Sequence, residues 1–117
     1  MVVAAPERRT VELAAMVGLA TGATVRSEPG LSPRFAGTHA GRAESAVAAD
    51  DRSFFEALIL YRAGLLDGYD VPVRGESLRD FENRVGRAIE RIETEPARNV
   101  IVCAHSSSIT AALMQYG

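Results

Sequence analysis

One stretch constrains this chain more than any other: residues 99–110, which read NVIVCAHSSSIT. Residues 100–103 are apolar and mostly β-branched, without polar alternation, a pattern typical of a strand buried on both faces of a parallel sheet. The serines that follow His105 can cap a helix, and apolar residues between positions 109 and 116 then fall at helical spacing. We therefore expect a central strand that carries His105 at its carboxyl end, directly before a helix.

This arrangement would place His105 where open α/β sheets bind ligands, at the carboxyl ends of the strands. The first N–H groups of the following helix have no partner within that helix, and such groups favour an anion. His105, Ser106 and Ser107 are therefore candidates for an anion site. The alternative is an ordinary strand–turn–helix in which the histidine is a loop residue with satisfied hydrogen bonds.

Composition narrows the class of protein and its partners. A chain of 117 residues, 47% hydrophobic and 24% charged, fits one ordinary globular domain. Its net charge of −2 gives no electrostatic reason to expect nucleic acid or an anionic membrane as a partner. Cys103 is the only cysteine, so no disulfide can form within the chain. Because we find neither a signal-peptide pattern nor an apolar run of about 20 residues, we expect a cytoplasmic location.

The remaining pattern alternates strands and helices. The clearest helix begins at Ser77, which has capping-box spacing to Asp80, and ends before Pro96. Its apolar residues form one stripe, consisting of Leu78, Phe81, Val85, Ile89 and Ile92. Before it we expect a strand over 2–5, a helix from Pro6, a weak strand over 23–26, a loop over 28–42, and helices over 43–50 and 52–66. Leu13, Met16 and Val17 should lie on the buried face of the helix that begins at Pro6.

This order favours an α/β sandwich of three layers with a mostly parallel central sheet. We expect a single domain over residues 1–117, with a helical insert at about 43–74. The insert shows no pattern that identifies a substrate.

Four segments, taken in order, resemble the histidine phosphatase superfamily, the group that includes cofactor-dependent phosphoglycerate mutase. They are Ala5-Pro6-Glu7-Arg8-Arg9, the spacing of Leu31, Gly37 and Gly41, the segment Gly75-Glu76-Ser77 followed by Asp80 and Arg84, and residues 100–109 with His105. The resemblance implies a phosphoglycerate mutase-like fold. It also implies a phosphomonoester hydrolase or phosphoryl-transfer activity that proceeds through a phosphohistidine.

The resemblance assigns roles to individual residues. Arg9 matches the arginine that clamps phosphate, and His105 matches the histidine that stabilises the transferring phosphoryl group. Ser106 and Ser107 would add phosphate-binding groups, while Glu76 and Glu28 are possible residues at the pocket edge. Guanidinium forks and imidazole donors suit this chemistry because they stabilise charge spread over phosphoryl oxygens. No metal or other cofactor is expected.

The chain also departs from the family pattern. It contains no Arg-His-Gly segment, which carries the nucleophilic histidine in the family, so we expect an incomplete member that lacks the first strand–helix unit and the final strand. Pro33 stands where the family usually has its acidic glutamate, and a proline cannot transfer a proton. Glu28 is the nearest carboxylate in sequence. His39 is the only other histidine; it is either a substitute nucleophile or a packing residue.

Two functions remain open at this stage. The first is an enzyme whose partner is a phosphorylated small molecule or inorganic phosphate. The second is a non-catalytic pseudo-phosphatase that binds an anion or a partner protein. In either case, an incomplete sheet would leave an apolar edge, which predicts either a homo-oligomer that covers it or poor behaviour of the chain as an isolated monomer.

Overall fold

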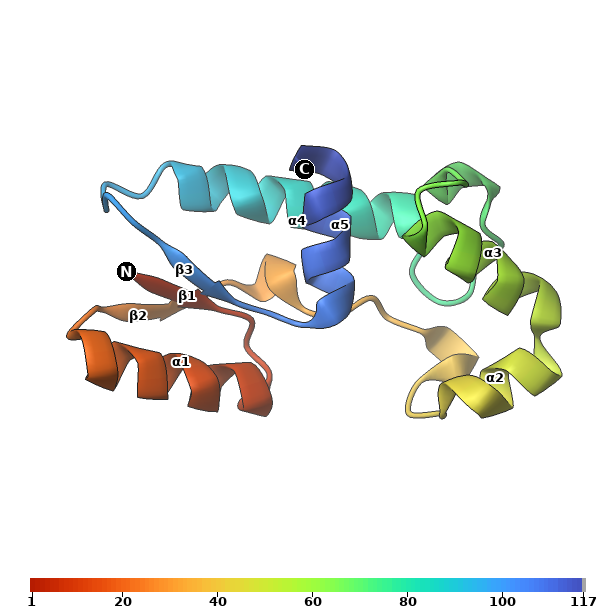
Figure 1. The fold of residues 1–117 in the computed structure, drawn as a ribbon, viewed down its shortest axis with the longest axis horizontal. Helices are drawn as coiled ribbons and strands as arrows, with labels where there is room; N and C mark the ends of the chain where they lie inside the picture. Colours follow the sequence, from red (N-terminus) through yellow and green to blue (C-terminus); the bar gives the residue numbers. More distant parts are fainter. Residues whose placement is uncertain (117) are drawn as a thin grey trace. The chain divides into compact units, whose positions relative to one another are not determined.

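The computed structural model describes residues 1–116 and contains two compact units: residues 1–33 with the chain from residue 83 onward, and residues 34–82. Figure 1 labels the helices and strands. In chain order they are β1 (Val2–Ala4), α1 (Arg8–Thr21), β2 (Val25–Ser27), α2 (Glu44–Asp50), α3 (Arg52–Arg62), α4 (Leu78–Glu93), β3 (Ile101–Cys103) and α5 (Ser106–Tyr116). Short 3₁₀ turns lie at Pro29–Leu31, Gly37–His39 and Gly68–Asp70.

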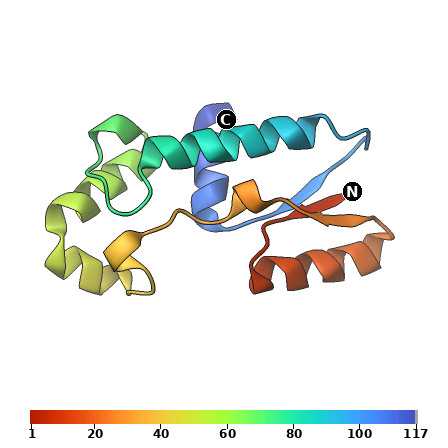
Figure 2. The same ribbon diagram turned by 180° about the vertical axis from the view of Figure 1, so that it is seen from behind.

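The first unit is built on a parallel sheet with the strand order β2–β1–β3. The central strand β1 is buried, and its successive side chains point to opposite faces. Val3 packs with Ile92 of α4, whereas Val2 and Ala4 pack with Ala14 of α1. α1 and the second half of α4 therefore cover opposite faces of the sheet, as the two ribbon views show (Figure 1 and Figure 2). This arrangement confirms the expected α/β class and the parallel sheet.

The last strand, β3, does not have the central place that its sequence predicts. It pairs with β1, with Val102 opposite Val3, and forms an edge of the sheet as far as residues 1–116 define it. Ile101 and Val102 are 45% and 38% exposed, so the expectation of burial on both faces is wrong. An apolar run shows which contacts a strand is suited to make, but not how many neighbours it has. The same pattern is therefore shared by β1 in the centre and β3 at the edge.

The buried face of α1 also differs from the expected one. Leu13 and Met16 are 50% and 67% exposed, while Thr10, Ala14 and Gly18 are buried. The helix approaches β2 so closely that a Cβ at Gly18 would lie 2.6 Å from Val25 Cγ2. Small residues allow this approach, and the larger side chains are therefore turned away from the sheet.

The second unit consists of α2, α3 and the loops on either side of them. Asp51 connects these parts: it accepts a hydrogen bond from Arg74 Nε at 2.6 Å and contacts His39 Nε2 at 2.9 Å. These two hydrogen bonds lower the pKa of Asp51 to about 2. Two loops of the unit are joined by backbone, since the N–H of Glu76 donates to the carbonyl of Phe35 at 2.8 Å.

The helix α4 forms as its sequence predicts. The hydroxyl of Ser77 accepts a hydrogen bond from the N–H of Asp80 at 3.0 Å, which confirms the capping interaction. Its stripe is buried at Leu78, Phe81, Val85 and Ile92, with exposed fractions between 0% and 6%. Within the described residues, no helix is both long and apolar enough to cross a membrane.

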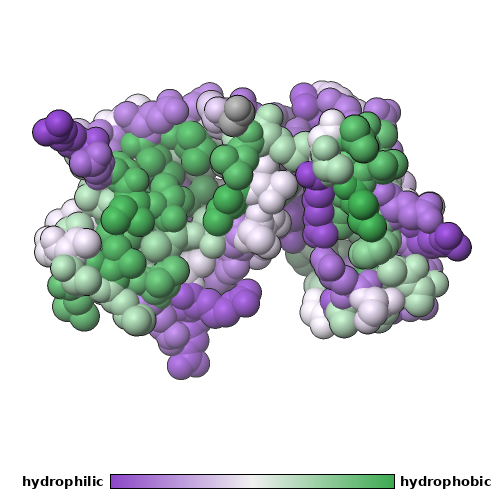
Figure 3. All heavy atoms as spheres, viewed as in Figure 1, coloured by the Kyte–Doolittle hydropathy of each residue, from purple (hydrophilic) through white to green (hydrophobic). Residues whose placement is uncertain are grey.

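Apolar side chains gather on the surface over β3 (Figure 3). On the α4 side of the sheet, a groove of about 280 Å³ is lined mainly by apolar residues of β3, α4 and α5, among them Val102, Ile89 and Leu113. An exposed apolar edge strand is a site of association with another chain. The fold therefore gives a physical basis for the predicted oligomer.

We expect the 12.5-kDa chain to associate in solution through β3. Val102→Lys places a charge on this strand at a half-exposed position, so it should shift the elution in size-exclusion chromatography with light scattering toward the monomer. Leu19→Lys is the control, because Leu19 is 88% exposed on α1 and lies outside the sheet. A wild-type chain that remains monomeric at high concentration would contradict this prediction.

Candidate functional site

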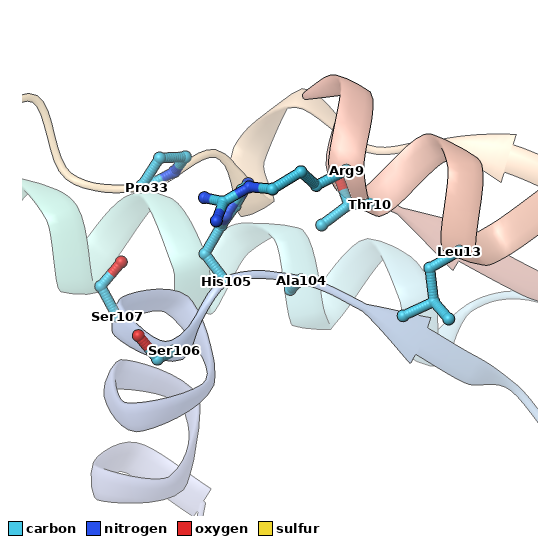
Figure 4. Close-up of a pocket in the computed structure, with 8 residues that line it drawn as sticks. All are labelled: Arg9, Thr10, Leu13, Pro33, Ala104, His105, Ser106 and Ser107. Atoms are coloured by element: carbon cyan, nitrogen blue, oxygen red, sulfur yellow. The ribbon is translucent and has the colours of Figure 1, made fainter.

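A pocket of about 450 Å³ lies where β1 and β3 end (Figure 4). Arg9 and Thr10 come from the first turn of α1, which follows β1, and His105 comes directly after β3. The remaining lining residues are Leu13, Pro33, Ala104, Ser106 and Ser107. Because β1 and β3 are parallel and adjacent, their carboxyl ends meet at one edge of the sheet. The structure thus brings Arg9 and His105, which are far apart in sequence, into one pocket.

His105 is held by a carboxylate that sequence reasoning did not select. Its Nε2 lies 2.8 Å from Glu7 Oε1, and Ser32 Oγ donates to Glu7 Oε2 at 2.9 Å. Since an ionised carboxylate can only accept, the imidazole carries a proton on Nε2 in this contact. Glu7, like Arg9, follows β1 in the sequence. This position was the signal by which the sequence could have identified Glu7 as a residue of the pocket region. Glu7 therefore acts as a positioning residue that fixes the ring of His105.

Arg9 is the unpaired cation of the pocket. Within residues 1–116 its guanidinium has neither a hydrogen bond nor an ion pair, whereas Arg8 is paired with Glu12 at 2.8 Å. Figure 4 shows the side chain of Arg9 extending from α1 toward the side of the pocket formed by Pro33 and His105. Five N–H donors are therefore available to an anion that enters the pocket.

The serines after His105 have different surroundings. Ser106 and Ser107 line the pocket at the start of α5, where the first backbone N–H groups have no partner within the helix. Ser108 is 1% exposed, and its hydroxyl donates to the carbonyl of Leu31 at 2.7 Å. Ser108 thus attaches α5 to the loop after β2, while the first two serines face the pocket.

Arg84 of α4 holds the loop that contains Pro33. Its Nη1 donates to the carbonyls of Gly30 and Ser32 at 3.0 and 2.9 Å, and its Nη2 donates to that of Pro33 at 3.3 Å. Pro33 is thereby fixed in the pocket wall. A proline supplies no proton at that position.

Glu28 lies outside the residues that line the pocket. It is 3% exposed and accepts two hydrogen bonds from Arg91, from Nε and from Nη2, both at 2.9 Å. The N–H of Gly30 donates to its second oxygen at 3.0 Å. The hydrogen bonds from Arg91 are the main cause of a lowered pKa for Glu28. This favours the carboxylate form and opposes a role as proton donor.

Glu76 and His39 belong to the second unit. The carbonyl of Glu76 accepts a hydrogen bond from Arg34 at 3.0 Å, and its Oε1 accepts one from the N–H of Phe35 at 3.3 Å. His39 contacts Asp51 and packs against the ring of Phe54, with ring centroids 5.6 Å apart. Both contacts of His39 lie within the second unit. The place of Glu76 at the pocket edge stays a prediction.

The pocket can bind an anion by three kinds of donor: a guanidinium fork, an imidazole and the first turn of a helix. Among the described residues, no group of three or more histidine, cysteine, aspartate or glutamate side chains could hold a metal ion. The polar groups that line the pocket are a guanidinium, an imidazole and the hydroxyls of Thr10, Ser106 and Ser107.

Comparison with known proteins places this geometry in a family. A model of the histidine phosphatase superfamily (branch 1) matches residues 1–117. The native structure of mycobacterial glucosyl-3-phosphoglycerate phosphatase superposes on the chain with a TM-score of 0.73 at 26% sequence identity. That match covers 98% of this chain and 56% of the phosphatase, so this chain spans a little over half the length of its structural neighbour. No curated protein matches the sequence significantly.

The fold and the pocket define an α/β protein with a polar pocket at the carboxyl ends of two parallel strands. The family model matches the whole sequence, and the chain belongs to the histidine phosphatase superfamily. Its fold is phosphoglycerate mutase-like and incomplete relative to the structural neighbour, as the resemblance implies. Both the family and the fold class predicted from the sequence are confirmed.

The Glu28–Arg91 pair gives the protein a pH-dependent stability. The pKa of Glu28 is lowered from 4.5 in the folded state, so the stabilisation is present above that pH and is lost as the pH falls through the folded pKa. Glu28→Gln should lower the free energy of unfolding by about 1 to 2 kcal/mol at pH 7 and flatten its decline below pH 4.5. Urea unfolding over a pH series measures both effects.

The matched control for this prediction is Glu12→Gln. Glu12 also pairs with an arginine, but its side chain is 61% exposed, so its loss should cost less than about 0.5 kcal/mol. Equal losses of stability in the two variants would mean that burial of Glu28 does not strengthen its ion pair.

Proposed function

We propose that the pocket of the first unit binds the phosphoryl group of a phosphomonoester, and that this chain carries part of the catalytic site of a histidine phosphatase. The observation that carries the proposal is the convergence of Arg9 and His105 on one pocket in a chain that belongs to this superfamily. The name of the structural neighbour, a phosphatase of glucosyl-3-phosphoglycerate, supports the same class of reaction.

Each donor has a distinct part in this proposal. The fork of Arg9 binds two phosphoryl oxygens at once, which fixes the orientation of the group as well as its charge. His105 donates a hydrogen bond to an equatorial oxygen and stabilises negative charge as it redistributes in the transition state. The N–H groups at the start of α5 contact a further oxygen.

The chemical step requires a histidine that this sequence does not supply in the family context. In the proposed reaction, the imidazole of that histidine attacks phosphorus, a P–N bond forms, and the P–O bond to the leaving alcohol breaks. The alcohol oxygen takes a proton from solvent water. A water molecule then attacks phosphorus and the P–N bond breaks, which releases phosphate and the free imidazole. Arg9 and His105 bind the phosphoryl group in both steps of this reaction. Neither is the nucleophile.

Inorganic phosphate tests the binding part of the proposal. At about 100 times its dissociation constant, phosphate should stabilise the chain by about 2.7 kcal/mol, seen as a rise in melting temperature. Arg9→Ala should abolish this rise, because it removes the free guanidinium of the pocket. Arg8→Ala is the control: it removes the neighbouring arginine, which is exposed, paired with Glu12 and absent from the pocket lining.

The proposal fails if Arg8→Ala and Arg9→Ala reduce the effect of phosphate equally, since the stabilisation would then be a general salt effect. It also fails if the wild-type chain gains no stability from phosphate. His105→Ala provides a second variant at the opposite wall of the pocket and should weaken binding in the same way as Arg9→Ala.

A second candidate function is a pseudo-phosphatase that binds an anion without turning it over. Two features of the sequence favour it: the absence of an Arg-His-Gly segment and the presence of Pro33 where the family usually has a glutamate. This function uses the same pocket and the same donors. It differs from the first only in turnover, so an activity measurement separates the two.

We expect the 117-residue chain to hydrolyse an aryl phosphate no faster than its His105→Ala variant. The reason is that each histidine contacts a carboxylate through Nε2, His105 that of Glu7 and His39 that of Asp51. Release of the aryl alcohol, followed by absorbance, measures the rate. A clear rate in the wild-type chain that disappears in His105→Ala would instead favour the enzyme and overturn the pseudo-phosphatase.

The partner in either case is a phosphorylated small molecule or inorganic phosphate. The helical segment at about 43–74 is where the protein would distinguish substrates. A cytoplasmic location and a homo-oligomer formed through β3 complete the proposal.

A further inference from the structure

We propose that the second unit has a binding site of its own for a small organic carboxylate, in a cavity where three arginines and His39 surround an aromatic floor. The site is independent of the phosphate pocket, because every residue that forms it lies between positions 34 and 62. It therefore adds a second anion site to the protein proposed above.

The cavity has a volume of about 120 Å³ and lies among α2, α3 and the loop that precedes α2. Its polar lining consists of Arg34, Arg42, Arg62, His39 and Glu44, and its apolar lining consists of Ala36, Val47, Phe54, Phe55 and Leu58. Phe54 is 2% exposed and forms part of the core of this unit. The lining thus contains three guanidinium groups and one carboxylate around an apolar base.

Arg34 is the most enclosed of these cations. Its Nη1 donates to the carbonyls of Phe35 and Glu76 at 3.3 and 3.0 Å, and also to that of Arg74. The guanidinium carbon lies 5.4 Å from the centre of the Phe54 ring, a cation–π distance. Burial lowers the pKa of Arg34, and the nearby carboxylate of Glu76 opposes this shift. A ligand carboxylate in the cavity would add a second negative charge beside the guanidinium.

The other two arginines have partners that are exposed and easily exchanged. Arg62 Nη1 lies 3.1 Å from Glu44 Oε1, and the side chains of this pair are 47% and 71% exposed. Arg42 pairs with Asp50, whose side chain is 64% exposed. Exposed ion pairs contribute little to stability, so replacing the partner of either arginine with a ligand carboxylate costs little.

His39 provides an independent indication that a polar partner is missing. Its side chain is 9% exposed and lines the cavity, and Nε2 contacts Asp51 Oδ2 at 2.9 Å. Nδ1 is buried and has no hydrogen-bond partner among the described residues. Buried polar atoms are normally paired, so an unpaired one requires an explanation. A ligand in the cavity that His39 lines would supply such a partner.

The lining selects the chemical class of the ligand. A carboxylate matches the planar fork of arginine, and a short carbon chain on it would pack against Phe54, Phe55 and Leu58. A phosphate dianion has no apolar part, and the aromatic floor would remove its water without replacing the hydrogen bonds. Butyrate is therefore the appropriate probe, and inorganic phosphate is the comparison.

The experiment is a titration of the ¹⁵N-labelled full chain with sodium butyrate at constant ionic strength. We expect amide shifts that saturate and are confined to residues 34–62. Arg62→Ala and Arg42→Gln should each weaken butyrate binding by about ten-fold, the loss expected for one charge-assisted hydrogen bond. The amide spectrum of each variant shows directly whether it is folded, and the two substitutions lie on different elements.

Arg52→Ala is the matched control. Arg52 also lies on α3 and pairs with a glutamate, Glu56, but it does not line the cavity. Its substitution should leave butyrate affinity unchanged. Arg9→Ala should likewise leave butyrate affinity unchanged while it abolishes phosphate binding at the other pocket, so failure of one site is distinguishable from failure of the other.

Three results would overturn the proposal. The first is the absence of saturable shifts in residues 34–62 of the wild-type chain. The second is an equal loss of affinity in Arg52→Ala and in the two lining variants, which would show a general charge effect. The third is phosphate binding to residues 34–62 as tightly as butyrate, which would show that the ligand class is wrong.

Discussion

Parallel pairing of β1 with β3 is the interaction on which the pocket of Arg9 and His105 depends. The N–H of Ala5 donates to the carbonyl of Cys103 at 2.9 Å, at the point where both strands end. The register sets Ala4 opposite Cys103, so the segments that follow the two strands leave the same edge of the sheet at the same height. Glu7 Oε1 and His105 Nε2 are consequently 2.8 Å apart, although the two residues are 98 positions apart in the sequence.

The sequence predicted those features that follow from local pattern or from the rule of parallel strands. The stripe and the cap of α4 are local, and both form as expected. The meeting of Arg9 and His105 in one pocket follows from two predicted strands whose carboxyl ends share an edge. Their roles in binding phosphate remain predictions, supported by membership in the superfamily.

Features that depend on tertiary neighbours could not be predicted in this way. Leu13 and Met16 are exposed because Ala14 and Gly18 allow α1 to approach the sheet, and periodicity does not report how closely a helix packs. The edge position of β3 was missed because its apolar run resembles that of β1. Glu7 was missed because its partner, His105, is adjacent only in three dimensions.

The contact between Glu7 and His105 gives the phosphate pocket an internal counter-ion. The carboxylate already uses the Nε2 proton of the imidazole, and Ser32 supports it from the other oxygen. A ligand oxygen that approached Nε2 would compete with this carboxylate for the hydrogen bond. The histidine is held in place before any ligand arrives, and some ligand affinity is given up in exchange for that preorganisation.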